Sequence, residues 1–198
     1  MTRSRVTLAI ALLFVCSAAF AQHEHGTQKP AMDPAMMKAM MEAGTPGEPH
    51  KKLDTFAGKW DTKVTSWMVP GADPMTMEGT SETRWVMGGR YLEQKFSGSF
   101  MGMPFEGIGY TGYDNVKKQY WSTWMDNMST ALFASTGALD GSTWSFTGSS
   151  ADPMTGKDMR ADSKIMVADA DHHTMEMWAP GPDGKMFKSM VMTYSRKK

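Results

Sequence analysis

Two adjacent histidines offer the most site-like chemistry in this sequence. His172 and His173 follow Asp171, and an imidazole can carry protons or bind a metal. Neighbouring residues of a strand point to opposite faces, so only one of the two rings can face the interior of a sheet. A single inward histidine can hold haem iron, although nothing else in the sequence points to haem. We favour a simpler interpretation, in which this cluster is a solvated turn that leads into a strand.

A carboxylate among aromatic side chains is the second candidate. Asp126 follows Trp124 by two residues, so both share one face of a strand. If that face is inward, the carboxylate needs a partner or a proton. A hydrolase or isomerase built around Asp126 or His173 is therefore one alternative. We favour an Asp126 that binds the amides of the turn at 127–130. Because the chain has no nucleophile elbow, phosphate loop or metal-spaced cysteine set, we predict that it is not an enzyme.

Methionine is unusually frequent, with 22 residues in the chain. Thioethers bind Cu(I), and His23 and His25 lie in a polar tail that could add imidazole ligands. A periplasmic copper-handling protein is therefore a second alternative. Methionine is also a pliable filler of irregular apolar space. Since the excess is spread over the whole chain, we favour the filler role and predict no metal and no cofactor. Four pairs share a strand face: Met75 and Met77, Met101 and Met103, Met175 and Met177, and Met190 and Met192.

The first residues resemble a secretory signal peptide. Two arginines precede the short apolar run Val6–Val15, and Ala19–Ala21 fits the small-x-small cleavage rule. We expect residues 1–21 to be removed and the mature protein to be periplasmic or secreted. Residues 22–32 are polar and are expected to form a disordered tail.

Composition excludes some classes of partner. Lysine plus arginine and aspartate plus glutamate number 21 each, and no basic stripe appears, so we expect no nucleic acid partner. The apolar run near the start is too short to cross a bilayer, and we predict no membrane span. Cys16 is the only cysteine and leaves with the leader. Stability must therefore come from the core, which seven tryptophans and nine phenylalanines can build.

One short helix is expected before the strands. Within residues 33–52, the segment Asp33–Gly44 starts with a capping aspartate and a proline and ends in a glycine. An apolar stripe at helical spacing is formed by Met36, Met37, Met40 and Met41. We expect this stripe to pack on the following domain or on a second subunit, so a homodimer remains an option.

Residues 53–198 show the pattern of strands. The stretch Phe105–Thr130 predicts two antiparallel arms around a turn at Asp114 and Asn115, with aromatic side chains on both faces. Similar alternating segments joined by short Gly, Pro and Asp turns recur along the domain, and we expect about ten strands. Sequential strands with short turns form an antiparallel meander, and closure would remove its edges. The predicted fold is all-β, an antiparallel up-and-down barrel with one N-terminal helix packed on it.

Several motifs together resemble the bacterial family called domain of unknown function 1579. The resemblance covers roughly Met32–Lys197 and implies the fold more than a function, because that family offers no catalytic residues to carry over. The motifs are Leu53-x-x-Phe56-x-Gly58-x-Trp60 with Pro70-Gly71, Gly89-Arg90-Tyr91-Leu92, Gly112-Tyr113-Asp114-Asn115, Trp124-x-Asp126, Asp152-Pro153-x-Thr155-Gly156-Lys157 and Tyr194-x-Arg196.

The chain is also similar, more loosely, to lipocalin-like (calycin) barrels. These begin with Gly-x-Trp on the first strand, here Gly58-Lys59-Trp60, and carry an arginine near the end of the last strand, here Arg196. The resemblance implies that Trp60 plugs one end of the barrel and that the guanidinium stacks on its ring.

A barrel of this strand number is wide enough for a cavity. With Trp60 inward, Gly107 and Gly109 leave room between the inward aromatic side chains. We therefore expect an exported, non-enzymatic protein that binds a small apolar or amphipathic ligand, with the Tyr113 hydroxyl as an orienting group. A barrel packed solid by the same side chains is the competing picture. The predicted ligand-binding residues are Trp85, Phe96, Tyr113, Trp124 and Asp126.

Overall fold

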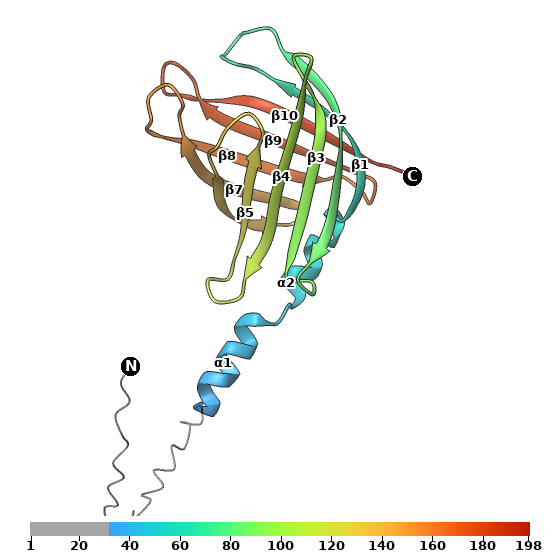
Figure 1. Ribbon diagram of the computed structural model, residues 1–198, viewed down its shortest axis with the longest axis vertical. Helices are drawn as coiled ribbons and strands as arrows, with labels where there is room; N and C mark the ends of the chain where they lie inside the picture. Colours follow the sequence, from blue (N-terminus) through green and yellow to red (C-terminus); the bar gives the residue numbers. More distant parts are fainter. Residues whose placement is uncertain (1–31) are drawn as a thin grey trace, which may run out of the picture. The chain divides into compact units, whose positions relative to one another are not determined.

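The computed structural model describes residues 32–198. The predictions for the leader, for the tail up to residue 31 and for His23 and His25 lie outside these residues. Two helices, α1 (Pro34–Gly44) and α2 (Glu48–Lys51), are followed at once by a 3-10 turn, η1 (Lys52–Phe56). Ten strands complete the described chain (Figure 1): β1 (Gly58–Ser66), β2 (Met75–Val86), β3 (Tyr91–Phe100), β4 (Met103–Asp114), β5 (Gln119–Asp126), β6 (Phe133–Asp140), β7 (Thr143–Ala151), β8 (Asp158–Val167), β9 (His172–Pro180) and β10 (Met186–Arg196).

The strands form one closed antiparallel barrel. Each strand pairs with its neighbours in the chain, and β1 closes the sheet by pairing with β10. The predicted all-β, up-and-down barrel is therefore confirmed. We call the end where β1 begins and β10 ends the base, and the opposite end the rim. The connections between strands run from two residues, as at 101–102, to eight at 67–74, which suits a meander in which sequential strands are neighbours.

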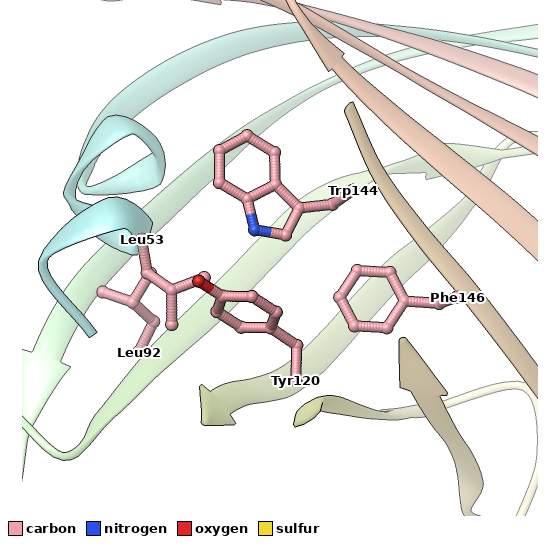
Figure 2. Packing of buried hydrophobic residues seen from close by; sticks show 5 residues of the cluster. All are labelled: Leu53, Leu92, Tyr120, Trp144 and Phe146. Atoms are coloured by element: carbon pink, nitrogen blue, oxygen red, sulfur yellow. The ribbon is translucent and has the colours of Figure 1, made fainter. Parts of the chain in front are cut away.

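Alternation along the strands separates the barrel interior from the outer surface. In β1, Trp60, Thr62 and Val64 are buried while Asp61 and Lys63 between them are exposed. Buried apolar residues of the described chain fall into two clusters. The base cluster comprises Leu53, Leu92, Tyr120, Trp144 and Phe146 (Figure 2). The wall cluster comprises Trp60, Val64, Phe96, Met192 and Tyr194.

The segment 48–56, formed by α2 and η1, closes the base of the barrel. Leu53 is completely buried among the side chains of the base cluster, as Figure 2 shows. Side chains of the barrel bind the backbone of this segment: the Trp60 Nε1–H donates to the Phe56 carbonyl at 3.0 Å, and the Tyr120 hydroxyl donates to the Pro49 carbonyl at 3.0 Å. The segment thus combines apolar burial with satisfied backbone carbonyls.

The predicted N-terminal helix is present as α1, but its continuation, not α1 itself, packs into the barrel. None of the residues of α1 is buried, and Met36, Met37, Met40 and Met41 are about half exposed or more. The methionine stripe therefore does not pack on the barrel as expected. Asn115, in the turn between β4 and β5, donates from Nδ2 to the carbonyls of Glu42, Ala43 and Thr45 and so satisfies the free C-terminal end of α1.

No helix within residues 32–198 combines the length and the apolar character needed to cross a bilayer.

Candidate ligand-binding cavity

A cavity of about 500 Å³ occupies the barrel interior. Residues of every strand contribute to its lining, together with Phe56 from the base segment. Aromatic rings make up much of its surface, contributed by Phe56, Phe96, Phe105, Trp124, Phe133 and Phe146. The described interior is therefore not packed solid by its aromatic side chains.

One side of the cavity is lined by thioethers, which we call the methionine wall. The register pairs Met175 with Met192 and Met177 with Met190 across β9 and β10, so all four side chains project from the same face. Met192 is buried in the wall cluster, and Met175 and Met190 pack against that cluster. The methionine wall comprises Met77, Met159, Met175, Met177, Met190 and Met192. The methionine excess is thus partly concentrated at one site, although many other methionines are exposed.

A strip of polar side chains runs along the same interior. Gln94 donates from Nε2 to the Ser81 hydroxyl at 2.9 Å and to the Tyr194 hydroxyl at 3.4 Å. Gln94 and Tyr194 line the cavity. Burial raises the pKa of Tyr194 to about 12, so this phenol is neutral at physiological pH. The strip offers hydroxyl and amide groups to an otherwise apolar space.

His173 is the most unusual polar group of the cavity. Its ring stacks on Tyr194 with 4.1 Å between centroids and makes edge contacts with Trp60 at 4.4 Å and Phe56 at 5.3 Å. Only 6% of the residue is exposed. Burial, and then the charge of Arg196, lower its pKa from 6.5 to about 4, so the ring is neutral near pH 7. Within residues 32–198 neither ring nitrogen makes a hydrogen bond.

The sequence pattern favours a solvated turn for both histidines. This interpretation is wrong for His173 and correct for His172. Residues 168–171 form the turn between β8 and β9, and His172 stays exposed with Nδ1 2.9 Å from the Asp169 carboxylate. His173 is the second residue of β9 and points inward. The strand begins at His172, as the alternation predicted, and places His173, Met175 and Met177 on the inner face.

Trp124 occupies the room that two glycines leave. The register pairs Trp124 with Gly109. A Cβ placed on Gly107 would collide with the indole ring, and a Cβ on Gly109 would lie 2.7 Å from the Thr123 carbonyl oxygen and 3.0 Å from the ring. Gly107 and Gly109 therefore accommodate Trp124 on the inner face of β4 and do not simply leave empty space for a ligand. The Trp124 Nε1–H donates to Asp126 Oδ2 at 3.0 Å.

Asp126 lies at the rim and serves the local turn. Its Oδ1 accepts a hydrogen bond from the Met128 amide at 3.0 Å, as the turn-binding interpretation requires. Both carboxylate oxygens thus have donors within the chain. Asp126 and His173 lie near opposite ends of the barrel, since one ends β5 at the rim and the other begins β9 at the base.

The five predicted ligand-binding residues separate into two groups. Phe96, Trp124 and Asp126 line the cavity. Trp85 and Tyr113 pack instead against the base cluster, where Trp85 Nε1 donates to the Asp54 carboxylate and Tyr113 makes an edge contact with His50 at 5.8 Å. The base segment 48–56 covers these two side chains, so they lie outside the cavity.

Several solved structures are similar to this chain. The crystal structure of Rv2717c from M. tuberculosis matches with a TM-score of 0.58 and 14% identity, over 78% of this chain and 100% of that chain. A redesigned beta barrel, b11L5F_LGL, matches with a TM-score of 0.42 and 14% identity, over 74% of this chain and 96% of its own. A de novo designed fluorescence-activating beta barrel matches with a TM-score of 0.40 and 17% identity, over 73% of this chain and 95% of its own. No curated protein matches.

A family model described as a protein of unknown function, DUF1579, matches residues 45–196. The matched range runs from three residues before the base segment to the end of β10. The resemblance that the sequence motifs indicated is thereby confirmed.

Proposed function

The chain belongs to the DUF1579 family of proteins of unknown function, and we propose that this member is an exported binding protein, not an enzyme, that holds a small apolar or amphipathic molecule inside its barrel. The observation that carries the proposal is the cavity of about 500 Å³ lined by aromatic rings and thioethers. This volume falls within the range of roughly 300–1,000 Å³ that small-molecule sites occupy. The leader-like run Val6–Val15 and the small-residue site Ala19–Ala21 support export to the periplasm or beyond.

The lining suits binding better than catalysis. Most of it is apolar, and the methionine wall can adapt its shape because thioether side chains are unbranched and flexible. Asp126 and His173, the two groups that could exchange protons, lie near opposite ends of the barrel and cannot act on one bond together. Both oxygens of Asp126 are already used by the chain.

Quenching of tryptophan fluorescence tests the binding proposal. A panel of fatty alcohols, fatty acids, isoprenoids and aromatic compounds should quench the intrinsic fluorescence with dissociation constants well below 1 mM for at least one class. Trp124→Phe should remove much of the signal because Trp124 lines the cavity. Trp178→Phe is the matched control, since Trp178 lies on the outer face beside Lys164 and Lys188. Quenching that survives Trp124→Phe and disappears with Trp178→Phe would place binding on the outside and refute the proposal.

Copper handling is a second candidate, and the methionine wall favours it. Met175 and Met192 are paired across β9 and β10, and His173 on the same inner face is two residues from Met175. Two thioethers and a neutral imidazole form a soft donor set of the kind that Cu(I) prefers. His23 and His25 could deliver the ion from the tail.

Competition with a chromogenic Cu(I) chelator under reducing conditions separates the two candidates. A copper protein should withdraw one Cu(I) per chain, and the double variant Met175→Leu, Met192→Leu should abolish this. The exposed pair Met36→Leu, Met37→Leu is the control, because it changes the same residue type outside the barrel. Failure of the native chain to compete removes copper handling and leaves the organic ligand.

A further inference from the structure

We infer that the ligand carries a single uncharged hydroxyl group, which binds His173 and the polar strip, and that the cavity discriminates against carboxylates of the same shape. This inference rests on the proposed function and names the chemical class of its ligand. Phenols and isoprenoid or other apolar alcohols belong to this class. Fatty acids and aromatic acids do not.

The His173 ring has hydrogen-bonding groups that no other described residue uses. A neutral imidazole has one N–H donor and one nitrogen acceptor, and within residues 32–198 both lack a partner although only 6% of the residue is exposed. Among the described residues, the side-chain polar atoms that are fully enclosed without a partner are Thr62 Oγ1 and Trp144 Nε1, so the ring nitrogens of His173 remain accessible from the cavity. His173 lines the cavity, so a molecule in the cavity can supply what the chain does not.

A hydroxyl group fits this site because it both donates and accepts. The hydroxyl can donate a hydrogen bond to the unprotonated imidazole nitrogen or accept one from the imidazole N–H. Its other hydrogen bond can then be made with a side chain of the polar strip. The phenol ring of Tyr194 stacks on the His173 ring, and Gln94 Nε2 donates to the Tyr194 hydroxyl at 3.4 Å. The protein therefore provides several neutral donors and acceptors in one place.

A carboxylate fits poorly because nothing in the lining compensates its charge. Among the described residues no lysine or arginine lines the cavity, whereas the carboxyl group of Asp126 does. Arg196 is the cation nearest His173, and its guanidinium N–H groups donate hydrogen bonds to the carbonyls of Ala57, Ala170 and Thr55. An ionised carboxylate inside would lose its hydration without gaining an ion pair, which is strongly unfavourable.

The closed base decides which end of the ligand meets His173. The base segment 48–56 covers the barrel at that end, and His173 contacts Phe56 of this segment. A ligand therefore presents its hydroxyl to the base, while its apolar body lies along the methionine wall towards the rim.

A matched series of naphthalenes tests the inference at pH 7.5 with the full mature chain. We expect 2-naphthol to bind at least tenfold more tightly than 2-naphthoate, and about fivefold more tightly than 2-methoxynaphthalene, which keeps the shape but cannot donate. His173→Phe preserves an aromatic ring in the stack and should reduce the preference for 2-naphthol over 2-methoxynaphthalene to less than twofold. His172→Phe, at the exposed neighbour, should leave it unchanged.

The outcomes separate this inference from the proposed function. Equal or tighter binding of 2-naphthoate would overturn the hydroxyl preference while leaving a ligand-binding barrel. A preference that persists in His173→Phe would overturn the role of His173. If His173→Phe does not fold, the comparison of the three compounds on the native chain still decides the ligand class. Failure of all three compounds and of the wider panel to bind would refute the proposed function itself.

Discussion

The guanidinium carbon of Arg196 lies 4.1 Å from the centre of the Trp60 indole ring, where the last strand meets the first. The register pairs these two residues directly across β1 and β10. Arg196 also donates through Nη1 to the Ala57 carbonyl and through Nε to the Ala170 carbonyl, each at 2.9 Å, and through Nη2 to the Thr55 carbonyl of the base segment at 3.4 Å. One side chain thus joins the base segment, the turn before β9 and the closing strand pair. Of these contacts, the resemblance to calycin barrels implied the stacking on Trp60.

Arg196→Lys should lower the free energy of unfolding by about 2 kcal/mol. Lysine keeps the charge but loses the planar fork that reaches several carbonyls, and it stacks less well on an indole. Urea denaturation measures the change. Lys197→Met is the control, because the Lys197–Asp61 pair spans 3.6 Å on an exposed surface and should contribute less than about 1 kcal/mol. Equal effects of the two variants would show that the fork of Arg196 does not hold the closure.

His173 should make the free protein less stable in mild acid. Its pKa lies near 4 in the folded chain against an ordinary 6.5, so between these values the unfolded chain binds more protons. The stabilising effect is therefore complete above about pH 6.5 and is lost as the pH falls towards 4. The gap corresponds to about 3 kcal/mol.

Chemical denaturation of the native chain and of His173→Phe between pH 5 and pH 7.5 measures this dependence, since the variant cannot titrate at that position. As the pH falls, the unfolding free energy of the native chain should decrease steadily relative to that of His173→Phe. A difference that is constant over this range would mean that His173 titrates normally in the folded protein. Imidazole resonances in an NMR titration give the pKa independently.

Gly107→Ala should destabilise the barrel by about 1–3 kcal/mol, because the new methyl group would occupy the place of the Trp124 ring. Combining it with Trp124→Leu should recover part of the loss, so that the double-mutant cycle shows a favourable coupling of at least about 1 kcal/mol. Gly44→Ala is the control, since a Cβ there meets nothing within 4 Å. Additive effects of Gly107→Ala and Trp124→Leu would contradict the contact.

The barrel could be predicted because its signals are local and repeated. Alternation in segments such as β1, together with short glycine turns, specifies sequential antiparallel strands. A long meander that closes into a barrel no longer has exposed edge strands. The pairing of Trp60 with Arg196 followed from the resemblance and was confirmed by the register. The turn role of Asp126 likewise depends on residues close in sequence.

Other parts of the site depend on contacts between distant segments. Nothing in the sequence pattern of residues 48–56 indicates that this segment packs into the barrel base. Because it does, Trp85 and Tyr113 are covered by the segment, while Phe96 still lines the cavity. A shift of one residue at the start of β9 reverses the faces of His172 and His173, and strand boundaries are the least certain feature of a pattern. The apolar stripe of α1 resembles a packing face, yet it is exposed.

Leu53→Ala should test whether the base segment stabilises the barrel or merely covers it. Leu53 is fully buried between Leu92, Tyr120 and the aromatic rings of the base cluster, so its truncation should cost about 2–5 kcal/mol. Leu132→Ala makes the same chemical change at a residue that is 54% exposed and should cost less than about 0.5 kcal/mol.

Hydrogen exchange should then show which part of Leu53→Ala is destabilised. In Leu53→Ala the amides of residues 48–56 should exchange faster than those of the central strands, because the segment loses its apolar anchor before the barrel opens. If Leu53→Ala and Leu132→Ala unfold at the same urea concentration as the native chain, the segment contributes nothing to stability. The base of the cavity would then open without cost, and a ligand could enter past His173 as easily as from the rim.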